Sequence, residues 1–225
     1  MASQTPSRIR LGLAIGFIAL CLLGTISARI TAQDPLTRFD QSVLETLHRE
    51  SSPTGVVVAT FISRLSSPMM MTVLAFAGAM LLAALGEWIV LAGWATAFAG
   101  ASLIDHWLKL TIHRPRPVYA AALLHSSSWS FPSGHAMGSL VGYGMLAYVL
   151  MLLARGKRST QRWIAAAAAA LIVAIGVSRL YQGVHYFSDV VGGYAAGLLL
   201  LSACVCAVEL GRRWERRALR LHPTG

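Results

Sequence analysis

Residues 88–108 read WIVLAGWATAFAGASLIDHWL, an apolar run in which Asp105 is the only formally charged side chain. A helix of roughly 20 apolar residues crosses the hydrocarbon core of a bilayer, so this run predicts a transmembrane helix. Five more runs of similar character predict an all-α polytopic membrane protein with six transmembrane helices in a bundle. The expected spans are Leu11–Ser27, Pro68–Leu85, Trp88–Leu108, Ala136–Ala154, Trp163–Ser178 and Asp189–Leu210.

The composition of the whole chain agrees with a membrane protein. Of the 225 residues, 56% are hydrophobic and only 12% are charged, about half the charge of a soluble domain. These values exclude a disordered protein, a nucleic-acid-binding tail and a typical soluble enzyme. The net charge of +10 would suggest a nucleic-acid partner in a soluble protein, but in a membrane protein it reflects basic cytoplasmic loops. We therefore expect no nucleic-acid partner.

The distribution of basic residues predicts the topology. With the N-terminus inside, 11 of the 19 Lys and Arg residues fall on the inner side, which favours cytoplasmic termini and a basic cytoplasmic tail over residues 211–225. The expected location is the inner (plasma) membrane of a bacterium. Arg8, Arg10 and the run after them also resemble a cleavable signal peptide. The run is somewhat long for one, so an uncleaved anchor is favoured.

Residues 34–50 predict a separate amphipathic helix between the first two spans. Asp34 can cap it and Pro35 suits its first turn. Its apolar residues fall on one face, as in a helix lying in the outer membrane interface or one packed on neighbouring loops. The second span is expected to have a short helical lead-in from Gly55, broken near Ser66-Ser67-Pro68.

Three polar clusters lie at the ends of the expected spans. They read KLTIHRPRP over residues 109–117, SFPSGH over residues 130–135 and SRLYQGVHYFSD over residues 178–189. Because consecutive spans run in opposite directions, all three clusters fall on one membrane face, which the charge distribution places outside. The residues expected to converge there are Lys109, Arg116, His135, Arg179, His185 and Asp189.

This set of side chains suits a tetrahedral anion such as phosphate. Three cations, the Ser133 hydroxyl and the amides at the start of the fourth span all favour phosphate. Two histidines in one phosphate site suggest a nucleophile and an acid, and Asp189 can hold one ring nitrogen of His185. A metal site built from His135, His185 and Asp189 is the alternative. We expect no metal, because the neighbouring cations would repel a divalent ion.

Together the clusters resemble the signature motifs of the type 2 phosphatidic acid phosphatase superfamily, in its membrane-bound lipid phosphatase branch. The motifs are Lys-x6-Arg-Pro, Pro-Ser-Gly-His and Ser-Arg-x5-His-x3-Asp, and every spacing matches here. Arg114-Pro115 is a second Arg-Pro pair, two residues too close to Lys109, so Arg116 is assigned to the motif. The resemblance implies catalysis by His185 as nucleophile, His135 as acid and base, and Asp189 as the partner of His185. It implies substrate binding by Lys109, Arg116, Ser133, Gly134 and Arg179.

The resemblance further implies dephosphorylation of a membrane lipid through a phosphohistidine, with no cofactor. The expected protein is one membrane-embedded phosphatase domain over residues 1–225, with its motifs in residues 109–189. Undecaprenyl diphosphate, phosphatidylglycerol phosphate, phosphatidic acid and a lipid A phosphate all fit as substrates. Two alternatives stay open: a lipid phosphotransferase that uses the same phosphohistidine, and a lipid transporter or binding protein without chemistry.

Overall fold

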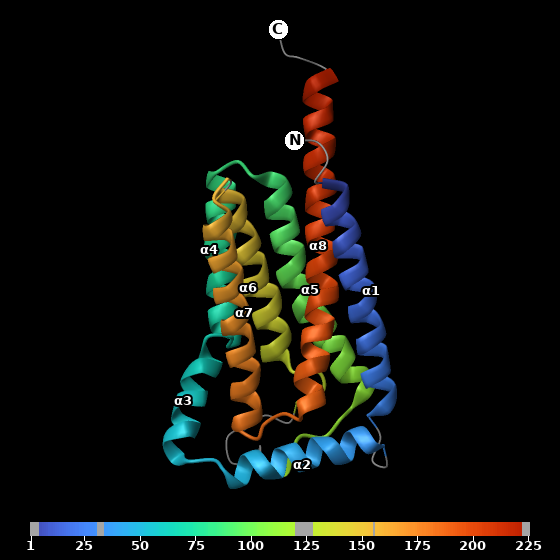
Figure 1. Cartoon of the computed structure of the whole chain (residues 1–225), viewed down its shortest axis with the longest axis vertical. Helices are drawn as coiled ribbons and strands as arrows, with labels where there is room; N and C mark the ends of the chain where they lie inside the picture. Colours follow the sequence, from blue (N-terminus) through green and yellow to red (C-terminus); the bar gives the residue numbers. More distant parts are fainter. Residues whose placement is uncertain (1–4, 31–33, 120–127, 155, 222–225) are drawn as a thin grey trace.

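A computed structural model describes residues 5–30, 34–119, 128–154 and 156–221, which form eight α-helices and no strand (Figure 1). The helices are α1 (Thr5–Arg29), α2 (Pro35–Arg49), α3 (Pro53–Arg64), α4 (Pro68–Ala84), α5 (Trp88–Ile112), α6 (Gly134–Leu153), α7 (Arg158–Tyr181) and α8 (Phe187–Leu221).

Six stretches of the described chain are long and apolar enough to cross a membrane, as the hydropathy of the sequence predicts. One of them contains both α3 and α4, which are separated by a break at residues 65–67. Exposed apolar side chains such as Phe17, Phe76 and Trp107 cover the outside of the bundle. A surface of this kind suits contact with lipid chains rather than water.

The bundle is organised around α8, which packs against α1, α5 and α6. Figure 1 shows α4 to α8 and α1 running along the long axis, with α8 projecting beyond the bundle at one end. The last expected span ends at Leu210, but α8 continues to Leu221, so the described part of the basic tail is helical. Residues 222–225 of the expected tail lie outside the described residues.

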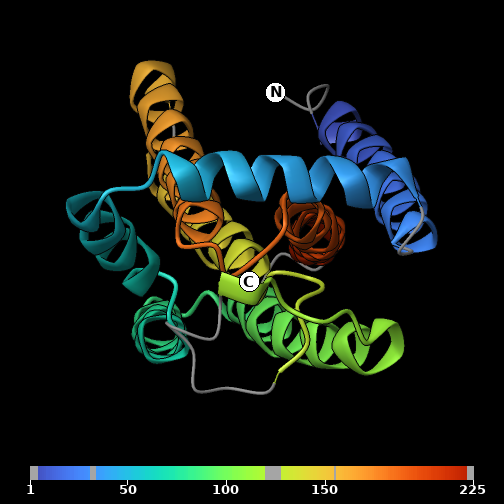
Figure 2. The ribbon, with the colours of Figure 1, turned by 90° about the horizontal axis from the view of Figure 1, so that it is seen from below.

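The opposite end of the bundle is covered by α2. This helix lies across the ends of α7 and α8 rather than along them (Figures 1 and 2). Asp34 is its N-cap and accepts a hydrogen bond from the Leu36 amide at 2.7 Å, and Pro35 follows in the first turn. A capping residue followed by proline also begins α3 and α4, with serine as the cap at Ser52-Pro53 and Ser67-Pro68. Local capping therefore sets where each of these three helices begins.

The apolar core lies between α5, α6 and α8. Its buried side chains include Trp94 on α5, Met145 on α6 and Val208 on α8. The Trp94 indole donates a hydrogen bond to the Ala75 carbonyl oxygen at 2.9 Å, which ties α4 to the same core. This core holds α5, α6 and α8 in a fixed relation, and the polar end of the bundle is built on those helices.

A close contact between the start of α6 and α8 depends on Gly193. A Cβ atom there would lie 2.6 Å from the Ser133 carbonyl oxygen and 3.1 Å from the Ala136 Cβ. Backbone cannot move aside as a flexible side chain can. We therefore expect Gly193→Ala to push α8 away from the start of α6 and to destabilise the protein by about 1–3 kcal/mol.

Thermal unfolding of the purified protein in detergent measures this effect. The matched control is Gly24→Ala on α1, because no atom lies within 4 Å of a Cβ placed there. Alanine is the better helix former, so Gly24→Ala should leave the unfolding temperature unchanged or slightly raised. Equal unfolding temperatures for the two variants would contradict the proposed contact.

Candidate active site

A cavity of about 430 Å³ opens at the end of the bundle that α2 covers. The residues that line it include six of the eight that the sequence suggests for the site. They come from the end of α5, the loop after it, the start of α6, the end of α7 and the loop before α8. These residues are Lys109, Arg116, Gly134, His135, Arg179 and His185. The alternation of helix directions thus brings together side chains that are far apart in sequence.

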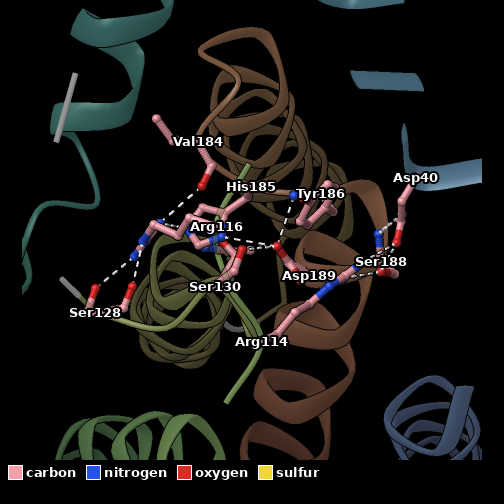
Figure 3. A network of polar contacts seen from close by, with 12 residues as sticks. Asp40, Arg114, Arg116, Ser128, Ser130, Val184, His185, Tyr186, Ser188 and Asp189 are labelled. Atoms are coloured by element: carbon pink, nitrogen blue, oxygen red, sulfur yellow. Dashed lines mark hydrogen bonds and ion pairs between the residues drawn. The ribbon is translucent and has the colours of Figure 1, made fainter. Parts of the chain in front are cut away.

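The loop after α5 sends two arginines in different directions. α5 ends at Ile112, and the left-handed conformation of its C-cap His113 (φ 50°) turns the chain away from the helix. Figure 3 shows Arg116 directed toward Ser128 and Val184, and Arg114 directed toward Asp189 and α2. Of these two arginines, only Arg116 lines the cavity. This agrees with the motif spacing, which assigns Arg116.

His185 is almost fully buried, yet it is among the residues that line the cavity. Its Nε2 atom lies 3.2 Å from Arg116 Nη1. A guanidinium group can only donate, so Nε2 is the nitrogen that accepts and carries the lone pair. Burial lowers the pKa of His185 to about 4, and Arg116 and Arg179 add to this shift although Asp189 opposes it. His185 is therefore a neutral imidazole at pH 7, and the electron pair on Nε2 faces the Arg116 guanidinium.

Asp189 lies in the first turn of α8 and is fully buried. One carboxylate oxygen, Oδ2, accepts hydrogen bonds from the Ser130 hydroxyl and, at 2.8 Å, from the Tyr186 amide. The other, Oδ1, accepts from Arg114 at 2.7 Å. His185 Nδ1 lies 3.5 Å from Oδ2, and within the described residues this buried nitrogen has no hydrogen-bond partner. The carboxylate thus faces the ring nitrogen that the sequence expects it to hold, without closing the bond.

Two helix ends supply the other cations. Arg179 Nη1 donates to the Ser63 hydroxyl on α3 at 2.6 Å and to Gln182 at 2.7 Å. The Gln182 amide in turn donates to Thr60 on α3 at 2.9 Å. Within the described residues, the buried Arg179 Nε has no hydrogen-bond partner. Arg179 is thus held in place through Nη1, while its Nε–H donor makes no hydrogen bond to the described residues.

Lys109 forms an ion pair with Asp105 at 2.6 Å, one helical turn earlier on α5. Asp105 also lines the cavity and was not expected there. A Cβ atom at Gly134 would lie 3.1 Å from Asp105 Oδ1 and 3.3 Å from Lys109 Nζ. The glycine therefore lets the start of α6 approach this ion pair.

Ser133, which the resemblance suggests as a phosphate ligand, lies at the start of α6. It is fully buried and is the N-cap of α6, where its hydroxyl accepts from the Ala136 amide at 3.5 Å. The residues that line the cavity do not include it, within the part of the chain described. Its own amide donates to the Asp189 carbonyl oxygen at 2.9 Å and joins α6 to α8.

Sequence reasoning missed several residues that support the site, namely Asp40, Ser63, Asp105, Arg114 and Ser130. For Asp40 a signal existed, because it occupies the position between Leu36 and Leu44 on the inward face of α2. An ionisable residue in that register needs a buried partner. Within the described ranges, no three or more His, Cys, Asp and Glu side chains are placed together to hold a metal ion.

The lowered pKa of His185 leads to a prediction. In ¹⁵N NMR spectra, the His185 ring, assigned by its loss in His185→Asn, should stay neutral from pH 7 to about 5 and take up a proton only near pH 4. Histidine in an unfolded chain titrates near pH 6.5, so the unfolded state binds more protons between these values. The unfolding temperature should therefore fall as the pH drops through this window, and less so in His185→Asn. Protonation near pH 6.5 would contradict the description of the site.

Comparison with known proteins places this site in a family. The sequence profile of the PAP2 superfamily matches residues 88–213. Phosphatidylglycerophosphatase B of Bacillus subtilis (strain 168) is 40% identical over 103 residues, which are 46% of this chain and 50% of the relative, so the matched part of the chain spans about half the length of that relative.

A crystal structure described as the first transmembrane PAP2 type phosphatidylglycerolphosphate phosphatase, from Bacillus subtilis, has a similar fold. It matches with a TM-score of 0.69 and 28% identity, covering 86% of this chain and 94% of that one. This likeness agrees with an integral membrane protein. Since the profile covers more than half of the chain and contains all three polar clusters, the chain belongs to the PAP2 superfamily.

Proposed function

We propose that the protein hydrolyses a lipid phosphate at the membrane surface through a phosphohistidine, without a metal ion. The observation that carries the proposal is the cavity itself. Its lining combines His185, His135 and three cations with apolar side chains of α4, α5 and α6, such as Met71, Phe98 and Val141. A lining of this composition suits an amphipathic molecule that carries a phosphate.

In the proposed reaction, His185 Nε2 attacks phosphorus while the bond from phosphorus to the lipid oxygen breaks. His135 gives its proton to the departing oxygen, so the lipid leaves as a neutral alcohol or a shorter phosphate. His135 then takes a proton from water, which attacks the phosphohistidine and releases inorganic phosphate. Lys109, Arg116 and Arg179 stabilise the charge that builds up on the phosphoryl oxygens.

The names of the relatives support phosphatidylglycerol phosphate as the first substrate to try. Undecaprenyl diphosphate and phosphatidic acid present the same chemistry to the polar residues of the cavity and belong in the same assay. A phosphotransferase would use the same first step and pass the phosphoryl group to a second lipid. Supplying a lipid alcohol together with labelled substrate separates transfer from hydrolysis.

Two histidine variants test the mechanism. His185→Asn should abolish phosphate release and also the acid-labile ³²P label on the quenched protein. His135→Asn should lower phosphate release by about 10²–10⁴-fold, the usual contribution of a general acid and base. The measurements are phosphate released from lipid in detergent micelles and ³²P retained on the protein, both with a chelator present.

A third test variant, Arg179→Gln, removes a charge from the cavity. Its charge-matched control is Arg217→Gln on the exposed part of α8. Only Arg179→Gln should lower turnover strongly. Activity that is lost with the chelator and restored by zinc or magnesium would contradict the metal-free mechanism. A ³²P label that persists in His185→Asn would assign the nucleophile elsewhere.

We further infer that the cavity faces the extracytoplasmic side. The supporting observation is the basic end of α8 with the start of α7, at the end of the bundle away from α2 (Figure 1). In a background with Cys21, Cys204 and Cys206 replaced by serine, an impermeant maleimide applied to intact spheroplasts should label Glu50→Cys. It should label Lys157→Cys only after lysis, and the reverse pattern would invert the topology.

A further inference from the structure

A buried chain of charges joins α2 to the candidate catalytic centre (Figure 3). Asp40 on α2 and Asp189 on α8 are both fully buried, and Arg114 between them is 5% exposed. Arg114 Nη2 donates to Asp40 Oδ2 at 2.7 Å, and Arg114 Nη1 donates to Asp189 Oδ1 at 2.7 Å. Two carboxylates from distant parts of the sequence therefore share one guanidinium.

Ser188 closes this arrangement. Its amide donates to Asp40 Oδ1 at 2.8 Å, and its hydroxyl donates to Asp40 Oδ2 and accepts from Arg114 Nη1. The Arg114 guanidinium also lies over the Tyr186 ring, with 4.2 Å from Cζ to the ring centroid. The contacts at Nη1 and Nη2 and with the face of the Tyr186 ring therefore fix the orientation of the guanidinium group.

The direction of these contacts matters for His185. Arg114 holds Asp189 by Oδ1, which leaves Oδ2 facing His185 Nδ1. Neither Arg114 nor Asp40 is among the described residues that line the cavity, so neither is placed to touch a substrate. Any effect they have on the reaction must pass through Asp189.

We propose that Asp40 and Arg114 are positioning residues, which fix the Asp189 carboxylate so that it orients the His185 ring. The proposal rests on the proposed function, because it assigns His185 as the nucleophile. Asp40 lies outside residues 88–213, which match the family profile. The catalytic centre of this chain is thus completed by α2, a helix that contains none of the three motifs.

The test compares single and double variants in the lipid phosphate assay. Arg114→Gln and Asp40→Asn should each lower kcat by about 10–100-fold. This range is known for residues that orient metal ligands without touching the metal. KM should stay within about twofold, because the cavity wall is unchanged. Since Asp40 acts through Arg114, the double variant should be no slower than Arg114→Gln alone. Glu45→Gln and Arg38→Gln remove exposed charges from the same helix and should leave kcat unchanged.

A variant that breaks a buried ion pair can also lose activity because the protein unfolds. A milder variant is therefore needed. Arg114→Lys keeps the charge but lacks the fork that reaches both carboxylates. We expect it to stay folded, as judged by thermal unfolding, and still to lose at least tenfold in kcat. A folded Arg114→Lys with wild-type kcat would overturn the proposal.

A second measurement does not depend on turnover. In ¹⁵N NMR spectra at neutral pH, wild-type His185 should be a single tautomer protonated at Nδ1. Arg114→Lys and Asp40→Asn should show a mixture of tautomers, and Glu45→Gln should not. If the wild type hydrolyses none of the lipid phosphates, the proposed function fails, and the tautomer spectra still decide the positioning role. Unchanged tautomers in folded variants would refute that role.

Discussion

The candidate active site depends on the burial of one carboxylate. Asp189 has no exposed surface, and an isolated buried carboxylate costs far more free energy than a folded protein can spare. Its charge is compensated by Arg114, by the Ser130 hydroxyl and by the Tyr186 amide. These partners belong to the loop after α5, the chain before α6 and the turn before α8. Compensating one charge therefore brings three separate segments to the same point.

The residues of the site form two groups with different origins. The six predicted residues that line the cavity come from the end of α5, the loop after it, the start of α6, the end of α7 and the loop before α8, within the matched family profile. Helices outside the profile add supporting contacts: Asp40 on α2 contacts Arg114, and Thr60 and Ser63 on α3 contact Gln182 and Arg179. Because α2 and α3 pack against α7, they brace the polar end of a bundle whose own core is apolar.

Hydropathy and spacing account for much of this structure, and contacts between distant residues account for the rest. The six spans follow from runs of apolar residues, and the common face of the polar clusters follows from alternating helix directions. The partner of Asp40 could not be found in this way, because Arg114 lies 74 residues away. Ser133 looks like an anion ligand in sequence, but its hydroxyl caps α6 instead. A local pattern cannot tell these two uses of one hydroxyl apart.

The cations of the cavity already have partners before any anion arrives. Lys109 is paired with Asp105, and Arg116 donates to His185 Nε2 and to the Val184 carbonyl oxygen. These partners lower the free-energy cost of burying the cations. In the proposed mechanism, a phosphate takes the place of some of them. The exchange at Arg116 has a chemical consequence. In the proposed mechanism, an Arg116 N–H that turns to a phosphate oxygen would release the lone pair of His185 Nε2 beside the phosphorus, so that binding the anion would also expose the nucleophile.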